Sequence, residues 1–410
     1  MTNYPNFRSP DVLLDHARHT MRFYHPRALD PAGGMYHYFK DDGAVYDASH
    51  RHLVSSTRFV FTYAMAYRQF RDPAYLAGLT HAVAFVREAH RALDGDGYAW
   101  MLDGREIEDG TQHAYGEAFV LLAYAHAAMA GLDEARPWIG EAFDLMERRF
   151  WNPDDGLYAD EASQDWRVLS TYRGQNANMH ACEALLAAHA ATGEQRYLER
   201  AYTVAWNITQ RQAARCGGLV WEHYDTAWQP DWKFNIDDPE NLFRPWGYQP
   251  GHFTEWAKLL LLLEARAKGV LDKDLDWLLP TAEKLFGVAV EKGWDGEHGG
   301  LCYSLAPDLT VCDAHKYFWV QAESAAAAAM LAARTGNAEY WTWYDRLWQY
   351  SWTHFVDHQH GAWYRILDRE NRKLSDEKSP AGKVDYHTMG AVYDIVAVLE
   401  DGAGAESLAR

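Results

Sequence analysis

The sequence predicts an all-α fold, an (α/α)6 barrel of six inner and six outer helices with short β-hairpins in the long loops at one mouth. Three observations lead to it: a landmark that recurs six times, two helical segments for each unit, and connections that are alternately short and long. We expect residues 1–410 to form a single domain. The alternative is an open helical solenoid, but such repeats do not carry a hairpin in every unit.

A glycine followed by alternating aromatic and polar residues marks each unit. The copies begin at Gly34, Gly97, Gly156, Gly218, Gly300 and Gly361. They lie roughly sixty residues apart, with one longer interval after the fourth copy. The alternation, together with the high content of Tyr and Trp, predicts a short strand or hairpin at each copy.

Twelve segments with a helical period account for most of the remaining chain. They are predicted at 12–24, 49–71, 73–91, 111–130, 134–150, 175–191, 194–211, 250–268, 272–292, 314–334, 338–355 and 383–399. Segments that are apolar nearly all round, such as 118–125 and 322–333, are typical of buried inner helices. Segment 277–292 has a charged face and is predicted to lie outside. Short turns follow the inner helices, so their N-termini are expected at the mouth with the long loops.

Composition limits the classes of function. The formal net charge of −19 argues against binding to nucleic acid or to an anionic membrane, both of which require clustered Lys and Arg. Four scattered cysteines without a C-x-x-C motif favour a reduced protein. The first ten residues lack an apolar signal segment, and the longest apolar run, 259–263, is too short to span a bilayer. The expected location is the cytoplasm, as a monomer or a homodimer.

Aromatic residues are dense, with 18 Trp and 25 Tyr. Aromatic faces stack on sugar rings, so the composition fits a carbohydrate site, but it equally fits a large core filled by Trp and Tyr. The stretch 243–256 gathers several of these residues where a turn-rich loop enters a helix. Pro250 suits the first turn of that helix, and His252 and Glu255 share one of its faces. We expect the loop 232–246 to form a lid or rim over this site.

Polar residues near the start of every inner helix should converge if the barrel prediction is right. In chain order they are Arg58; Gln112 and His113; Asn176 and His180; His252 and Glu255; Lys316, Trp319 and Glu323; and Asp385 and His387. Each alone has a structural interpretation, because a buried histidine is commonly a hydrogen-bonded core residue, and Arg58 and Glu323 suit a structural ion pair. Ionisable groups on all six helices favour a common site, because burying so many without a function is costly.

Six motifs carry a resemblance to a known family. They are 51–59, 176–184, 221–225, 235–239, 243–256 and 385–387. Together they resemble the N-acylglucosamine 2-epimerase superfamily, which includes cellobiose 2-epimerases and aldose–ketose isomerases. The resemblance covers nearly the whole chain and is strongest to the D-mannose isomerase branch. It implies proton transfer between C1 and C2 of an open-chain sugar, through a cis-enediolate.

The resemblance also implies which residues act. His252 and His387 would be the acid/base pair, with His387 moving the proton from C2 to C1 and His252 assisting ring opening and proton transfer at the carbonyl end. Histidine titrates near neutral pH, which suits removal of a proton next to a carbonyl. The substrate-binding residues that the resemblance implies are Arg58, Asn176, His180, Glu255, Trp319 and Glu323.

Within that set, Arg58 and His180 would hold the substrate oxygens and stabilise the enediolate, whose developing charge needs a nearby cation or donor. Asn176 and Glu255 would support them. Trp319 would form a wall of the sugar pocket, and Glu323 would orient a histidine.

The implied substrate is a neutral monosaccharide, D-mannose or D-fructose, with D-lyxose and D-xylulose as a second pair. No cofactor and no metal are expected, because the sequence has no P-loop, no Rossmann fingerprint and no H-E-x-x-H motif.

Four alternatives remain open. A sugar 2-epimerase of the N-acylglucosamine or cellobiose type would use the same two histidines. The others are a metal-dependent enzyme, a glycoside hydrolase and a sugar-binding protein without activity. The hydrolase would need two carboxylates, from Glu222, Asp237, Asp238 and Glu255.

Overall fold

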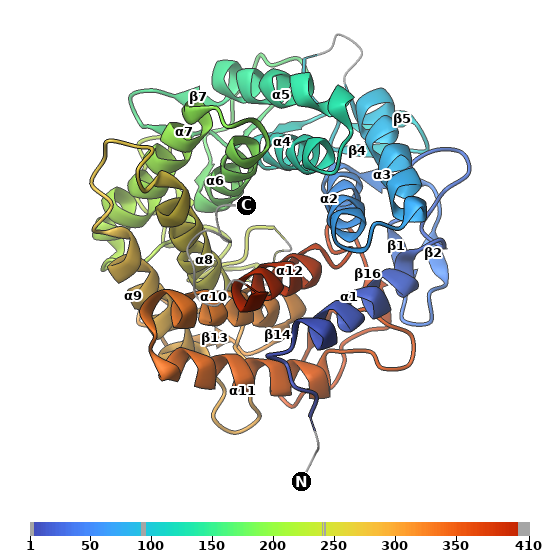
Figure 1. The fold of residues 1–410 in the computed structure, drawn as a ribbon. Helices are drawn as coiled ribbons and strands as arrows, with labels where there is room; N and C mark the ends of the chain where they lie inside the picture. The colour runs from blue at the N-terminus through green and yellow to red at the C-terminus, as the bar shows by residue number, and fades with distance from the viewer. Residues whose placement is uncertain (1–3, 92–95, 240, 242, 401–410) are drawn as a thin grey trace.

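The computed structural model describes residues 4–91, 96–239, 241 and 243–400, and these residues form two concentric rings of α-helices (Figure 1). The inner ring consists of α2 (Leu53–Phe70), α4 (Ala114–Met129), α6 (Gln175–Thr192), α8 (Pro250–Ala267), α10 (Phe318–Thr335) and α12 (Tyr386–Glu400). The outer ring consists of α1 (Pro10–Tyr24), α3 (Pro73–Phe85), α5 (Arg136–Arg149), α7 (Gln195–Trp206), α9 (Leu278–Gly293) and α11 (Ala338–His354).

The inner ring is closed. Each inner helix packs on the next, from α2 round to α10, and α12 packs against both α10 and α2. Every outer helix covers one inner helix: α3 covers α2, α5 covers α4, and so on round the ring, with α1 covering α12. The predicted (α/α)6 barrel is therefore confirmed, and the first and last helices of the chain lie side by side (Figure 1).

Alanine allows the inner helices to approach closely. In α10 the residues 325–329 are all alanine, and all are almost completely buried. Alanine also has the highest helix propensity, so these segments need no amphipathic pattern to be helical. Most buried apolar side chains of both rings form one hydrophobic core, and Phe85, Ala89, Ala99 and Leu102 form a small second cluster. None of the helices in the described ranges is long and apolar enough to cross a membrane.

Short turns connect α2 to α3, α6 to α7 and α10 to α11 at the rear of the barrel. Arg71, Gly193 and Gly336 end α2, α6 and α10 in the left-handed conformation, with φ of 55°, 74° and 72°. The next helix begins within three residues. At the start of α3, for example, the side chain of Asp72 accepts a hydrogen bond from the backbone N–H of Ala74. This places the N-termini of the inner helices at the opposite, long-loop mouth, as predicted.

The long loops hold short antiparallel strands. They are β1 (Tyr38–Lys40), β2 (Val45–Asp47), β3 (His50–His52), β4 (Met101–Asp103), β5 (Glu106–Asp109), β6 (Gln112–His113), β7 (Trp151–Asn152), β8 (Leu157–Tyr158), β9 (Glu161–Ala162), β10 (Arg173–Gly174), β11 (His223–Tyr224), β12 (Ser304–Leu305), β13 (Val311–Asp313), β14 (Lys316–Tyr317), β15 (Ile366–Leu367) and β16 (Glu377–Ser379). The pairs are β1 with β2 and β16, β3 with β4, β4 with β5, β6 with β9, β7 with β8, β10 with β11, β12 with β13, and β14 with β15.

The recurring glycine landmarks fold back onto the chain that follows an outer helix. The bridged pairs are Leu29 with Met35, Arg91 with Tyr98, Trp151 with Tyr158, Trp294 with Leu301, and Val356 with Trp363. At Gly300 the backbone has a φ of +81°, and an added Cβ would lie 2.4 Å from the Tyr350 ring. A left-handed turn pressed against an aromatic ring from the neighbouring outer helix explains the need for glycine there.

Several predicted helix boundaries are wrong, for a common reason. The segments expected to start at 49, 111 and 314 begin as helices only at Leu53, Ala114 and Phe318. The residues before them pair as β3, β6 and β14, and a strand ladder withholds those backbone groups from the helix. The segment expected from 272 starts at Leu278. The segments expected to reach 91 and 211 end in π-helical turns, Val86–His90 and Asn207–Gln212.

Candidate active site

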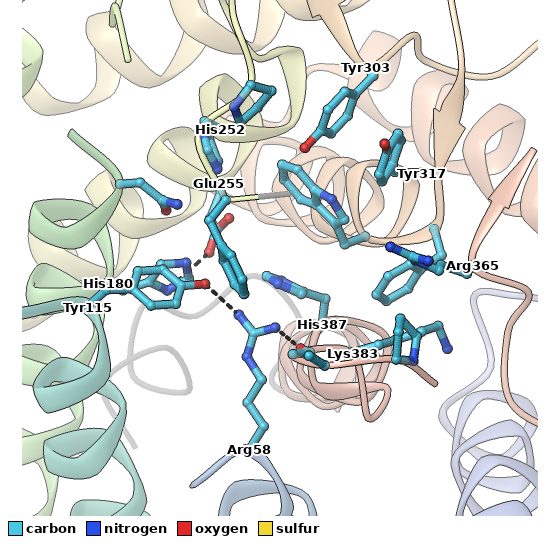
Figure 2. Close-up of a pocket in the computed structure, with 18 residues that line it drawn as sticks. Arg58, Tyr115, His180, His252, Glu255, Tyr303, Tyr317, Arg365, Lys383 and His387 are labelled. Carbon is cyan, nitrogen blue, oxygen red and sulfur yellow. Dashed lines mark hydrogen bonds and ion pairs between the residues drawn. The ribbon is translucent and has the colours of Figure 1, made fainter. Parts of the chain in front are cut away.

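A cavity opens at the mouth where the inner helices begin (Figure 2). Its volume is about 710 Å³ when the part open to solvent is included. Seven of the eight predicted site residues line it: Arg58, Asn176, His180, His252, Glu255, Trp319 and His387. The eighth, Glu323, lies directly behind His387. The cavity is also lined by Tyr115, Phe243, Pro245, Tyr303, Tyr317, Phe318, Arg365, Pro380, Ala381, Gly382 and Lys383.

His387, at the start of α12, is oriented by a carboxylate. Its Nδ1 lies 2.7 Å from Oε1 of Glu323, and the other oxygen of Glu323 lies 2.6 Å from Nζ of Lys258. The Nδ1–H of His387 therefore donates to Glu323, and Nε2 remains with a lone pair for the cavity. Burial and the nearby Arg58 guanidinium lower the pKa of His387 well below its ordinary value, so the ring is a neutral base.

His252, in the first turn of α8, has the same arrangement with a different carboxylate. Its Nδ1 lies 3.0 Å from each oxygen of Glu222. The amide of Gln175 supports this pair, because its nitrogen donates to Glu222 at 2.8 Å while its oxygen accepts from Trp256 at 2.7 Å. The sequence did not reveal this partnership. Glu222 belongs to one of the recognised motifs, but no period connects it to His252.

Trp319, from the first turn of α10, contacts both imidazoles. Its ring centroid lies 5.1 Å from that of His252 and 5.6 Å from that of His387, with an interplanar angle of 35° in each case. The indole therefore fixes the spacing of the two rings and supplies an apolar wall between them. Such a surface suits the carbon face of a sugar.

Arg58, on α2, keeps its charge free of carboxylates. Its guanidinium lies over the rings of Phe119 and Tyr386, at 4.4 and 4.6 Å. It donates to the hydroxyl of Tyr115 at 3.1 Å and to the backbone carbonyl of Gly382. All of these partners are neutral, so the positive charge of Arg58 remains available to an anionic group in the cavity.

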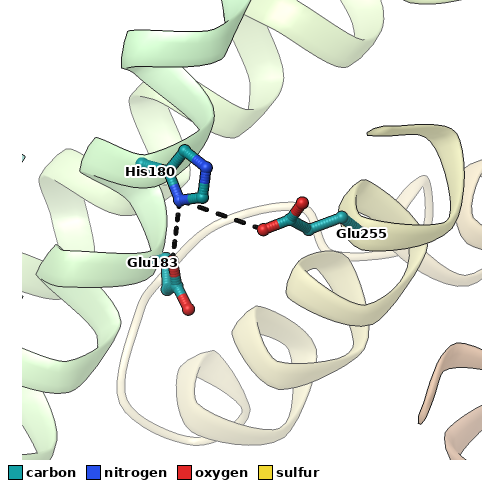
Figure 3. A group of neighbouring side chains, drawn as sticks. All are labelled: His180, Glu183 and Glu255. Atoms are coloured by element: carbon teal, nitrogen blue, oxygen red, sulfur yellow. Dashed lines mark hydrogen bonds and ion pairs between the residues drawn. The ribbon is translucent and has the colours of Figure 1, made fainter. Parts of the chain in front are cut away.

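His180 and Glu183 form a third imidazole–carboxylate pair, one turn apart on α6 (Figure 3). Nδ1 of His180 lies 2.9 Å from Glu183, whose other oxygen accepts from the hydroxyl of Tyr386. Burial alone would raise the pKa of Glu183, but the hydrogen bond from His180 and nearby positive charge hold it at about 2. Glu255 faces the same imidazole at a longer distance, 3.9 Å.

Two groups of side chains are close enough to hold a metal ion: His180, Glu183 and Glu255, and Glu255, Glu323 and His387, each with donor atoms within 4.8 Å. The hydrogen bonds within these two groups do not suit a metal ion. In both groups the histidine nitrogen that faces the carboxylates carries the proton, and Lys258 already neutralises Glu323. Only Glu255 has a carboxyl group without such a partner, and one carboxyl group is a poor site for a divalent cation.

Several residues expected at the mouth lie elsewhere. Gln112 and Lys316 sit on strands, where Gln112 donates to Gly110 and Lys316 donates to the carbonyl of Arg369 at 2.6 Å. Asp385 caps the turn before α12 and accepts from Lys383, Tyr24 and Thr388. These predictions fail because the residues precede the helices, in a strand or in a left-handed turn that directs the side chain away. Asp385 itself has a φ of +46°.

The loop 232–246 contributes to the rim only in part. Phe243 and Pro245 reach the cavity. Phe234 and Asn235 instead line a neighbouring cavity of about 910 Å³ that also contains His113. The predicted lid stays a prediction, and residues 240 and 242 of this loop lie outside the described residues.

The profile of the N-acylglucosamine 2-epimerase (GlcNAc 2-epimerase) family matches residues 34–391. The chain belongs to this family. Among curated members of the N-acylglucosamine 2-epimerase family, a D-mannose isomerase from Marinomonas mediterranea is 52% identical over 398 residues, covering 97% of this chain and 99% of that protein.

Solved structures from the N-acylglucosamine 2-epimerase family agree with the fold. The crystal structure of a D-mannose isomerase superposes with a TM-score of 0.92 at 52% identity, covering 96% of this chain and 99% of the other. The cellobiose 2-epimerase of Spirochaeta thermophila gives a TM-score of 0.84 at 22% identity, covering 98% and 99%. The second likeness shows the barrel alone.

Proposed function

We propose that the protein is an aldose–ketose isomerase that interconverts D-mannose and D-fructose. One observation supports this most: two imidazoles, those of His252 and His387, are each tied to a carboxylate through Nδ1 and each contact Trp319. A cation, Arg58, lines the same cavity. Two acid/base groups and a cation are the side chains needed to move a proton between adjacent carbons. The choice of sugar follows the relatives at 52% identity, which are named D-mannose isomerase.

The first step would be deprotonation of the open-chain aldose at C2. Nε2 of His387 takes the proton, the C–H electron pair forms the C1–C2 double bond, and the carbonyl electrons move to O1. The resulting enediolate is an anion, and Arg58 and His180 line the cavity where its oxygens would lie. Preorganised donors of this kind commonly supply about 3–4 kcal/mol of transition-state stabilisation each.

The second step completes the isomerisation. His387 returns its proton to C1 while O2 gives its proton to Nε2 of His252 and becomes the ketose carbonyl oxygen. His252, held by Glu222, passes this proton to O1 and would also assist opening of the sugar ring. The lowered pKa of His387 keeps it unprotonated at neutral pH, which a base requires, and the imidazolium that forms transiently is stabilised by Glu323.

A sugar 2-epimerase is the second candidate, because such an enzyme returns the proton to C2 from the opposite face with a second base, and both histidines are present. Incubation with D-mannose in deuterated water separates the two. The isomerase predicts fructose, with label at C1 in those turnovers in which the proton on His387 exchanges with solvent, whereas a 2-epimerase predicts glucose labelled at C2. Product analysis on D-lyxose, N-acetylglucosamine and cellobiose defines the substrate range. Failure to form a ketose or an epimer from any of these sugars would overturn both and leave a sugar-binding protein.

The proposal includes a single catalytic domain in the cytoplasm, without metal or cofactor, as a monomer or a homodimer that takes a neutral sugar. Activity should survive exhaustive chelation followed by dialysis, and restoration by an added divalent ion would contradict metal independence. Sedimentation analysis determines the assembly, and fractionation of cells determines the location. A glycoside hydrolase would instead release reducing ends from oligosaccharides, which we do not expect.

A further inference from the structure

Three glutamates from three inner helices meet beneath the cavity, but within the described part of the chain only two of them are hydrogen-bonded. Glu183 on α6 binds His180 and Tyr386, and Glu323 on α10 binds His387 and Lys258. Glu255 on α8 is 1% exposed. Neither of its oxygens has a hydrogen-bond partner among the described residues. Its closest ionic neighbour is Nδ1 of His180 at 3.9 Å, and that nitrogen already donates to Glu183 at 2.9 Å.

The charged and titratable groups around Glu255 come from every inner helix. From α2 comes Arg58, from α4 Tyr115, from α6 His180 and Glu183, from its own helix Lys258, from α10 Glu323, and from α12 Tyr386 and His387. Both cations have other partners. Lys258 binds Glu323 at 2.6 Å, and Arg58 donates to Tyr115 and Gly382.

Because both nearby cations have other partners, neither compensates a negative charge on Glu255. An ionised Glu255 would be a third negative charge beside Glu183 and Glu323, in a place almost closed to water. Burying an unpaired carboxylate is so costly that the group binds a proton instead. In agreement, burial and the charge of Glu323 raise the pKa of Glu255 well above its ordinary value.

We propose that Glu255 works as a neutral carboxylic acid whose O–H donates a hydrogen bond to the sugar oxygen that becomes negative in the enediolate. This inference rests on the proposed isomerase function. Glu255 lines the cavity, so its hydroxyl can reach a bound sugar. The proton stays on Glu255 throughout, and the residue is a donor, not a base. An ionised carboxylate at this place would repel the enediolate, whereas a neutral one stabilises it.

Protonation is tested first, independently of activity. The infrared difference spectrum of the wild-type protein minus Glu255→Gln at pH 7 should contain the carbonyl stretch of a protonated carboxylic acid. The matched control is Glu183→Gln, which removes an ionised group and should instead remove carboxylate bands. Carboxylate bands in the Glu255→Gln difference would overturn the proposal. Because this measurement needs no substrate, it remains informative if the protein turns out not to isomerise mannose.

Catalysis is tested with two substitutions at the same position. Glu255→Gln keeps a neutral donor of the same shape and should retain at least about a tenth of kcat. Glu255→Ala removes the donor and should lose about 10²-fold or more, the usual effect of deleting one oxyanion donor. Circular dichroism and urea unfolding confirm that both variants are folded. Equal, large losses in two folded variants would overturn the donor role, whereas an inactive wild-type protein would overturn the proposed function instead.

Discussion

Lys258 and Glu323 form an ion pair behind the catalytic cavity, with Nζ and Oε2 2.6 Å apart and both side chains almost completely buried. The remaining oxygen of Glu323 accepts the hydrogen bond of His387. Lys258 and Glu323 also border a larger cavity at the rear of the barrel. Burial raises the pKa of Glu323, and Lys258, which does not line the substrate cavity, opposes this by favouring the charged form of the carboxylate that orients the proposed base.

Replacement of Lys258 by Met should impair catalysis without direct loss of a substrate contact. Without Lys258, Glu323 would be an uncompensated buried charge, which costs roughly 3–5 kcal/mol. Alternatively, Glu323 would take up a proton and no longer accept the hydrogen bond from His387 as a carboxylate. We expect kcat to fall at least about tenfold, KM to change little, and the urea midpoint to fall. Lys258→Arg, which keeps the charge, is the control. Wild-type kcat and pH profile in Lys258→Met would refute a role for the pair.

His387→Asn should abolish turnover while the barrel stays folded. Asparagine can still bind Glu323 but cannot accept a proton from carbon, and a positioned base contributes about 10²–10⁴-fold. The readout is mannose turnover together with far-ultraviolet circular dichroism. His358→Asn serves as the control, since His358 is exposed and its ring lies against Trp352, far from the residues that line the cavity. Activity retained by His387→Asn would place the base elsewhere.

Glu222→Gln should reduce kcat more than it raises KM. Glutamine can present its amide N–H to Nδ1 of His252, which would reverse the tautomer and put the proton on Nε2. Losing the orienting carboxylate of a catalytic histidine costs about 10²-fold or more. Glu147→Gln is a matched control, because Glu147 pairs with Arg200 between two outer helices. If the two variants are equally active, His252 does not depend on Glu222.

Acid should destabilise the fold through buried histidines distant from the cavity. His90 donates to or accepts from Ser56 at 2.9 Å, and burial lowers its pKa to about 4; burial and the nearby His90 lower that of His52 to about 3. Because these pKa values are lower in the folded protein, the unfolded chain binds more protons, and stability is lost as the pH falls from about 6.5 towards 4.

The variant His90→Gln tests this reasoning. It removes one proton-binding group, so the slope of unfolding free energy against pH between 4 and 6 should decrease by about 1.4 kcal/mol per pH unit. Urea unfolding at several pH values measures that slope, and the exposed His358→Asn should leave it unaltered. If the slope for His90→Gln equals that of the wild-type protein, the pKa of His90 does not differ between the folded and unfolded states.

The barrel could be predicted because its structural repeat matches a repeat in the sequence: each unit contains a glycine landmark, an apolar helix and a charged helix. The residues on inner helices followed from the same period, so Arg58, His180, His252 and Trp319 were placed correctly in the cavity. Glu222 could not be placed in this way. It lies on a loop, and its meeting with His252 depends on how two units pack.

Local backbone geometry explains the other differences. Gln112 and Lys316 belong to strands that pair with distant segments, and sequence periodicity does not report such pairing. Asp385 sits in a left-handed turn, which directs its side chain to Tyr24 rather than to the sugar cavity. Lys258 follows Glu255 by three residues and therefore lies one turn deeper in the barrel. The pattern of polar residues at the starts of the inner helices does not extend to that depth, so it does not predict a role for Lys258.

The closure of the ring by α12 has a consequence for how the protein is made. This helix carries His387 and fits between α10 and α2, and the sequence of α2 is completed far earlier on the ribosome. Until α12 emerges, the flanks of α2 and α10 stay open and apolar, and the proposed base is missing. Contacts between such distant segments form slowly and late in folding. A nascent or truncated chain that stops before α12 is therefore both inactive and prone to aggregate, so activity reports completed synthesis.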